Sequence, residues 1–460
     1  MDRGLKDALD YIPTWLDYQI QSTRQPGCLL AVVHRGKVVL ERAFGVANLA
    51  TGEALTPRHR FRIASHSKSF TATGILKLRE QKRLRLDDAV GDHVKGLHRK
   101  TAEATIAQVL SHTAGIVRDG ADAGYFDERL AYPDAAGLLK DLAAAPVIEA
   151  GVRLKYSNHG FGLLGLVVAA VTGENYQRWI EREVVAAAGL KETTADMPLR
   201  RGTPFARGHS AYLPAGRRLV IPGDYREHAI APAGGFVSTA ADTALFFNQL
   251  APDARHSILS PASRREMIRR HWRNPHASLE GYYGLGIMSG TVNGWNWFGH
   301  SGGLLGYVSR TVTLPDSGIT ISIMSNAADG WAGFWLDGAI NILRTFAING
   351  PPSRRVSGWT GRWWGAWGAL DLVPMGNKVM AAGPFMANHP FLDASEIEVT
   401  GRDNGRIALA GGYGSHGEAV RRVRNKAGRV TEVWFAAGRL VSRARTVADL
   451  ERRYGKPPRR

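Results

Sequence analysis

Two β-hairpin signatures near opposite ends of a long chain constrain the fold most strongly. Residues 28–34 and 37–42 are β-rich runs joined by an Arg-Gly turn. Residues 307–314 and 319–325 alternate β-branched and polar side chains around a Pro-Asp-Ser-Gly turn. Between the hairpins, about residues 100–290 show mainly helical patterns interrupted by Gly- and Pro-rich turns. The sequence therefore predicts a sheet built from distant segments, together with a largely helical middle.

A change of pattern after residue 348 predicts a domain boundary. The helical run that ends there is followed by Asn-Gly-Pro-Pro-Ser-Arg-Arg, which a compact element would avoid. Short β-rich runs separated by Gly, Asn and Asp then continue to the end of the chain. We therefore expect a large domain over residues 1–348, a linker over 349–356 and a small β-rich, barrel-like domain over 357–460.

The composition excludes several classes of site. The single cysteine, Cys28, excludes an intrachain disulfide framework, zinc ribbons and iron–sulfur clusters. No spacing of His, Asp and Glu suggests a metal, so no cofactor is expected. The first twenty residues lack the pattern of an export signal. The longest uncharged apolar stretch, residues 159–173, is shorter than the roughly 20 residues that span a bilayer. We expect a cytoplasmic protein without a membrane span.

The chain is basic, with a formal charge of +18. Residues 351–460 hold 19 basic and 9 acidic side chains, and four tryptophans lie near arginines at the start of this segment. Such a pattern could bind nucleic acid. We interpret the charges as solvated surface and the tryptophans as barrel core and lid, so no nucleic-acid partner is expected. The expected partner is a small molecule or short peptide, and a homo-oligomer remains open.

Three short motifs carry residues suited to nucleophilic catalysis. They are Ser65-His-Ser-Lys68, Tyr156-Ser-Asn158 and His300-Ser-Gly302. Residues three apart on a helix share a face, so Lys68 is expected within reach of the Ser65 hydroxyl. A serine needs a neighbouring base, and a desolvated lysine can have its pKa lowered toward neutrality. With Ser65 at the start of a helix, free N–H groups would face a developing oxyanion.

The sequence segments around these motifs resemble those of the serine β-lactamase and penicillin-binding-protein superfamily. The matching segments are PRHRFRIASHSKSFTATGILKL, QVLSHTAGI, LKYSNHGFGLLGLVV, AGGFVSTAAD, YYGLGI and FGHSGGLLGYVSR, spread over roughly residues 20–345. They are most similar to the class C β-lactamase-like esterases and D-aminopeptidases. The resemblance implies an α/β (α+β) β-lactamase/transpeptidase-like fold: an antiparallel sheet flanked by helices, plus an all-helical subdomain.

The resemblance also implies roles for individual residues. Ser65 would be the acyl-forming nucleophile, with Lys68 as its hydrogen-bonded partner and Tyr156 as the second activator. Tyr156 and Lys68 would share proton transfer, and which of them is the resting base stays open. Asn158 would bind Lys68 and the acyl-side amide of the substrate. The backbone N–H groups of Ser65 and Gly303 would form the oxyanion hole, in the segment that also contains Gly302.

The sequence departs from the wall-directed enzymes at His300. Similar β-lactamases and carboxypeptidases have lysine there, whereas a histidine with a pKa of ~6.5 is mostly neutral at pH 7. Penicillins and D-Ala-D-Ala peptides carry a carboxylate that such a lysine would attract. We therefore expect a D-aminopeptidase, amidase or esterase rather than a potent β-lactamase. A β-lactamase or carboxypeptidase of the same fold is the alternative, and an inactive binding or regulatory protein is the alternative from another class.

Two other motifs offer competing interpretations. Residues 299–303 fit Gly-x-Ser-x-Gly, which would make Ser301 the nucleophile of an α/β-hydrolase elbow. An elbow needs a helix after the serine, but residues 307–314 are strand-like. Residues 412–417 fit Gly-x-Gly-x-x-Gly, yet no second strand–helix unit follows them. We expect a loop at that position.

Overall fold

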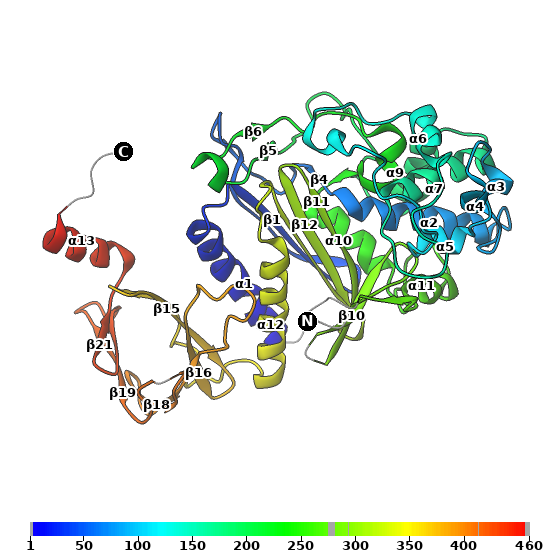
Figure 1. Ribbon diagram of the computed structural model, residues 1–460. Coiled ribbons are helices and arrows are strands. Elements are labelled where there is room, and N and C mark those ends of the chain that lie inside the picture. The colour runs from blue at the N-terminus through cyan, green and yellow to red at the C-terminus, as the bar shows by residue number, and fades with distance from the viewer. Residues whose placement is uncertain (1–2, 275–280, 293, 413, 456–460) are drawn as a thin grey trace. The chain divides into compact units, whose positions relative to one another are not determined.

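The computed structural model describes residues 3–274, 281–292, 294–412 and 414–455 (Figure 1). The chain forms two compact units. The larger unit comprises residues 25–333. The smaller unit combines the N-terminal residues, up to position 24, with those from 334 onward.

A nine-stranded sheet is the framework of the larger unit, and its neighbouring strands with assigned registers run antiparallel. Its order is β3-β2-β1-β13-β12-β11-β10-β9-β8. The strands are β1 (Gly27–His34), β2 (Lys37–Asn48), β3 (Glu53–Ala54), β8 (Trp272–Arg273), β9 (Gly281–Tyr283), β10 (Met288–Val292), β11 (Trp295–Leu304), β12 (Tyr307–Leu314) and β13 (Ile319–Ser325). Both predicted hairpins are confirmed. They meet where β1 pairs with β13, with Cys28 opposite Ser325.

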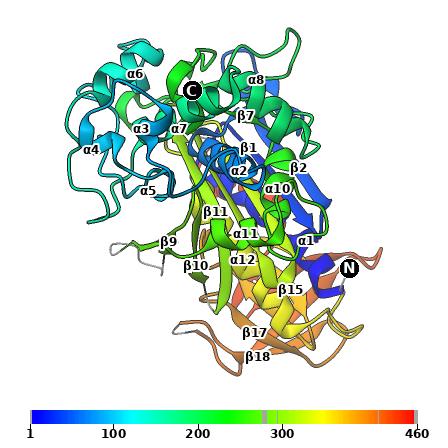
Figure 2. The same cartoon turned by 90° about the vertical axis from the view of Figure 1, so that its right-hand side faces the viewer.

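Helices make up most of the remainder of this unit. They are α2 (Ser67–Glu80), α3 (Val90–His93), α4 (Arg99–Ala102), α5 (Ile106–Leu110), α6 (Ala135–Leu142), α7 (Asn158–Thr172), α8 (Tyr176–Ile180), α9 (Ala231–Gly234), α10 (Ala240–Gln249) and α11 (Pro261–Ile268). Two short ladders pair β4 (Phe61–Arg62) with β7 (Val237–Ser238) and β5 (Gly208–His209) with β6 (Val220–Ile221). Helix α10 packs on β1, β12 and β13 (Figure 2).

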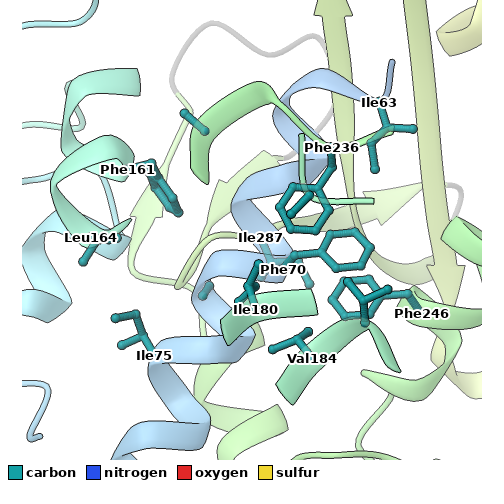
Figure 3. Packing of buried hydrophobic residues seen from close by; sticks show 14 of the residues in the cluster. Ile63, Phe70, Ile75, Phe161, Leu164, Ile180, Val184, Phe236, Phe246 and Ile287 are labelled. Carbon is teal, nitrogen blue, oxygen red and sulfur yellow. The ribbon is translucent and has the colours of Figure 1, made fainter. Parts of the chain in front are cut away.

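The core between the helices and the sheet contains a stack of phenylalanine rings. Phe70 on α2 lies between Phe236 and Phe246, with ring centroids 4.6 Å and 3.7 Å away (Figure 3). All three side chains are buried. Burial of an aromatic side chain stabilises a fold by about 1.5–3 kcal/mol, and stacking adds to this. The stack therefore fixes α2, the helix that follows Ser65, against the loop and helix at residues 236–249.

The predicted helix over residues 65–83 begins later than expected. Residues Ala64–His66 form a 3₁₀ turn, and α2 starts at Ser67. Ala64 has a φ of +47°, which a right-handed helix does not allow, and the chain enters α2 through this tighter turn. Another predicted helix, residues 176–188, is α8 followed by a π-helical turn, Glu181–Ala186.

The smaller unit contains an eight-stranded antiparallel sheet with the order β14 to β21. The strands are β14 (Gly361–Gly365), β15 (Gly368–Met375), β16 (Lys378–Ala382), β17 (Ser395–Val399), β18 (Asn404–Leu409), β19 (Ala419–Arg424), β20 (Val430–Phe435) and β21 (Gly438–Leu440). Two backbone hydrogen bonds between Trp364 and Val441, of 2.8 Å and 2.9 Å, bring the last strand back to the first. The predicted barrel-like domain is confirmed.

Three helices accompany this barrel: α1 (Arg3–Ser22), α12 (Ala332–Asn349), mostly within the unit, and α13 (Arg443–Tyr454). The Tyr11 hydroxyl of α1 donates to Asp371 Oδ2 at 3.0 Å, and Trp15 Nε1 donates to the carbonyl of Met386 at 3.2 Å. The N-terminal helix thus packs with the C-terminal barrel. The domain limits 1–348, 349–356 and 357–460 stay a prediction, because compactness does not show which segment folds independently.

Several smaller expectations can be compared with the described residues. Trp359 is buried in the barrel core, whereas Trp367 is fully exposed. The glycine-rich segment near residue 412 lies between β18 and β19, and its Tyr413 is outside the described residues. Within the described ranges, no helix is long and apolar enough to cross a membrane. In the same ranges, no group of three or more His, Cys, Asp or Glu side chains could hold a metal ion.

Candidate active site

Four segments that are distant in the sequence meet around one cavity of about 350 Å³ in the larger unit. The turn before α2 contributes Ser65, and the start of α7 contributes Asn158. Helix α9 contributes Ala233 and Gly234, and β11 contributes Gly303. The cavity therefore contains residues from the first two motifs that the sequence singled out, together with Gly303, which directly follows the third.

Lys68 lies at the centre of the site and is completely buried. Its Nζ donates to Ser65 Oγ at 3.2 Å, to Asn158 Oδ1 at 2.7 Å and to the carbonyl oxygen of Ala233 at 2.8 Å. Burial lowers the pKa of Lys68 to about 7, although the negative charges of Glu227 and Asp119 partly oppose the shift. Near neutral pH, this amine can therefore exist in both protonation states beside the serine hydroxyl.

Tyr156 approaches the same serine from the loop before α7. Its side chain forms a hydrogen bond with Ser65, and Lys68 Nζ lies 4.8 Å from the centroid of its ring. Burial raises the pKa of Tyr156 above its ordinary value, and the bond with Ser65 offsets this only in part. The phenol is therefore protonated near neutral pH and can donate a proton.

The backbone around Ser65 and β11 is unusually close-packed. A Cβ at Gly302 would lie 2.2 Å from the carbonyl oxygen of Ile63 and 3.0 Å from His66 Nδ1. Only glycine therefore lets β11 approach the turn that carries Ser65. Gly303 differs, because its Cβ would meet nothing within 4 Å and the residue lines the cavity. Ala64, just before Ser65, has a φ of +47°, a strained conformation that such packing can maintain.

His300 is held behind the cavity and is not among the residues that line it. Its Nδ1 donates to the carbonyl oxygen of Ser301 at 2.7 Å, so its Nε2 accepts from the Tyr283 hydroxyl at 3.0 Å. Burial, reinforced by the neighbouring His66, lowers the pKa of His300 well below its usual range. The histidine is therefore neutral, and it supplies no fixed positive charge to the site. Ser301 lies within strand β11, where it pairs with Arg310 of β12. It is therefore not at the strand–helix turn that a nucleophile elbow requires.

The structure adds residues that the motifs did not reveal. Asn158 Nδ2 donates to Asp119 Oδ1 at 2.6 Å, which fixes the orientation of the amide. Arg118 and Glu227 line the cavity. Burial raises the pKa of Glu227 to about 8, and Arg62, whose Nη1 lies 3.4 Å from its Oε1, opposes the shift. Only the fold brings Glu227 to the cavity, so the sequence offers no local signal for it.

Comparison with known proteins identifies the family. The Beta-lactamase family model matches residues 13–340. The chain belongs to this family. Membership confirms the predicted resemblance and fold. Protein flp of Staphylococcus aureus (strain MW2) is 26% identical to it over 339 residues, which cover 70% of this chain and 64% of flp. The chain thus spans less than two thirds of that relative's length.

Two solved structures show the same fold. The octameric penicillin-binding protein homologue from Pyrococcus abyssi has a TM-score of 0.65 at 21% identity, covering 94% of this chain and 99% of that one. The D-amino acid amidase from Ochrobactrum anthropi SV3, complexed with L-phenylalanine, has a TM-score of 0.64 at 21% identity, covering 74% and 98%. The first alignment extends over both units of this chain, whereas the second covers less of it.

Two neighbouring glycines provide a matched test of the site geometry. We expect Gly302→Ala to lower the free energy of unfolding by about 1–3 kcal/mol and to reduce hydrolysis sharply, because its methyl group must displace Ile63 and the adjoining Ser65 turn. Gly303→Ala has room for its methyl group and should keep wild-type stability. Thermal unfolding of both variants measures the difference. Equal stability of the two variants would contradict the close-packing account.

Proposed function

We propose that the protein hydrolyses an amide or ester bond through an acyl-enzyme on Ser65. The observation that carries the proposal is the 3.2 Å contact between Ser65 Oγ and Lys68 Nζ, in a cavity where burial lowers the pKa of that lysine to about 7. A serine becomes a nucleophile when a neighbouring base takes its proton. The proposed reaction uses no metal or cofactor.

In the first half of the proposed reaction, Ser65 Oγ attacks the carbonyl carbon while neutral Lys68 accepts the hydroxyl proton. The N–H groups of Ser65 and Gly303 stabilise the oxyanion. Tyr156 donates its proton to the departing amine or alkoxide and regains one from Lys68. Water then attacks the ester carbonyl while neutral Lys68 accepts one of its protons, the Ser65–acyl bond breaks to release the acid, and Lys68 returns that proton to Ser65 Oγ. The contrast in pKa between Lys68 and Tyr156 supports Lys68 as the base in the free enzyme.

The surroundings of the cavity favour compact substrates without an essential carboxylate. His300 is buried and neutral, so it does not replace the lysine found in β-lactam-directed relatives. The volume of about 350 Å³ suits an aminoacyl or other small acyl group. We therefore infer a D-aminopeptidase, amidase or esterase activity, and the similar fold of the D-amino acid amidase supports this class.

One observation favours the alternative of a carboxylate-bearing substrate. Arg118 lines the cavity, and its guanidinium lies 5.6 Å from the centroid of the Tyr156 ring. A guanidinium can bind a carboxylate through paired hydrogen bonds. A β-lactamase or carboxypeptidase activity would depend on this arginine.

The cellular location and the oligomeric state of the protein are also part of the proposal. We infer a cytoplasmic location and small-molecule or short-peptide substrates. We also propose that the chain can form a homo-oligomer, which the octameric homologue of similar fold supports.

A pH profile tests the role of Lys68. We expect kcat/KM for a D-aminoacyl p-nitroanilide to rise with pH through about 7, because raising the pH increases the neutral fraction of Lys68. The kcat/KM of Lys68→Arg should fall about a hundredfold or more, since arginine stays protonated. Lys77→Arg is the control, because Lys77 lies on the same helix but pairs with Glu183. A flat wild-type profile between pH 6 and 8 would contradict Lys68 as the base.

A substrate panel separates the two substrate classes. We expect D-aminoacyl p-nitroanilides or p-nitrophenyl esters to be hydrolysed with higher kcat/KM than nitrocefin. Arg118→Gln should weaken nitrocefin turnover roughly tenfold and affect the ester less, because only the β-lactam carries a carboxylate. Arg129→Gln, an exposed arginine of the same unit, is the matched control. Faster turnover of nitrocefin than of every amide and ester would favour the β-lactamase alternative.

A further inference from the structure

A second cavity, of about 460 Å³, lies in the smaller unit and is lined by arginines. It is formed by the segment before β14, the turn between β17 and β18, and strand β19. The lining side chains that matter here are Arg354, Arg355, Trp359, Arg402, Arg422 and Arg424. The sequence alone indicates a solvated surface for these charges, but the fold gathers five of them around one hollow.

Arg422 is a buried side chain that lines this cavity. Its side chain is only 5% exposed, and its guanidinium lies 4.2 Å from the centroid of the Trp359 ring. Nη1 donates to the carbonyl oxygen of Gly358 at 2.5 Å, and Nη2 donates to the carbonyl oxygen of Arg402. Its Nε has no partner among the described residues. A buried donor without an acceptor is costly, and an anion in the cavity would satisfy it.

The positive charge of the cavity is only partly neutralised within the part of the chain that the structure describes. Asp403 is the adjacent acid, and it pairs with Arg422 at 3.2 Å and Arg424 at 2.9 Å. Arg354, Arg355 and Arg402 are exposed and form no ion pair within the described residues. Five guanidinium groups therefore face one carboxylate.

The nearby acid Glu398 offsets part of this charge, because its carboxylate interacts electrostatically with Arg355. It forms its own pair with Arg406, at 2.7 Å, outside the cavity lining. Solvent screens the three exposed arginines, so their mutual repulsion is modest, but they concentrate positive charge beside the buried Arg422. A multivalent anion would offset that charge.

We propose that this cavity binds a small molecule through a doubly charged phosphate or diphosphate group. The planar guanidinium fork matches phosphate oxygens and donates two parallel hydrogen bonds to them. A monovalent carboxylate would neutralise only one of the unpaired arginines, whereas pyrophosphate matches their number more closely. The volume accommodates a diphosphate with a modest substituent. The site lies entirely within the smaller unit and is independent of Ser65 chemistry.

Isothermal titration of the full-length protein with inorganic pyrophosphate tests the proposal. We expect saturable binding that weakens as ionic strength rises. Arg402→Ala and Arg354→Ala should each raise Kd roughly tenfold, because each removes a charge-assisted contact. Both side chains are exposed, and the carbonyl of Arg402 that holds Arg422 is retained in the variant. Arg453→Ala, an exposed arginine on α13, is the control for net charge and should bind as the wild type does.

Further arms of the experiment identify the anion and its source. Citrate should bind at least tenfold more weakly than pyrophosphate if phosphate geometry matters. Cosedimentation with phosphatidylcholine vesicles containing phosphatidic acid, lost in Arg402→Ala, would assign the phosphate to a lipid headgroup, and its absence would assign it to a soluble ligand. The proposal is overturned if pyrophosphate does not bind, if citrate binds equally well, or if Arg453→Ala weakens binding as much as Arg402→Ala. Binding of single-stranded RNA without binding of pyrophosphate would also overturn it.

Discussion

The buried amine of Lys68 is the interaction on which the larger unit's site depends. Its three acceptors come from the turn before α2, the start of α7 and the α9 segment, so one side chain joins three separate pieces of backbone. Desolvation favours the neutral amine, while the three oxygens and the charges of Asp119 and Glu227 favour the ammonium. The opposing effects leave a lysine that can exchange a proton near neutrality. The same balance gives the site both its architecture and its proposed chemistry.

The close approach of β11 is the second constraint. Gly302 allows the strand to contact Ile63 and His66, while Ala64 adopts a left-handed conformation just before Ser65. Strand β11 therefore places Gly303 in the wall of the cavity that also contains Ser65. His300 lies three residues before Gly303 on the same strand, and its side chain is buried against Tyr283. The strand thus contributes backbone and space to the cavity rather than charge, which is why the proposed substrates differ from β-lactams.

Local patterns in the sequence predicted much of this architecture. Both hairpins and the barrel could be predicted because strand alternation and turn residues act over a few positions. The Ser65–Lys68 contact could be predicted from helical spacing, and the 3₁₀ turn at Ala64–His66 retains the contact although α2 begins only at Ser67. The later start of α2 could not, since the left-handed backbone at Ala64 and the close approach of β11 to the adjacent Ile63 have no local pattern in the sequence. Asp119, Tyr283 and Glu227 were missed for the same reason, because tertiary approach alone brings them to the site. The association of α1 with the barrel, through Tyr11 and Asp371, likewise has no local signal.

Covalent labelling tests the central claim most directly. The wild type, Ser65→Ala and Ser301→Ala proteins, all checked for folding, would be treated with a fluorophosphonate and analysed by intact-mass spectrometry. The account predicts a single adduct on the wild type and on Ser301→Ala, and none on Ser65→Ala. Loss of the adduct only in Ser301→Ala would move the nucleophile to β11. The absence of an adduct on all three proteins would instead favour a binding protein on this fold.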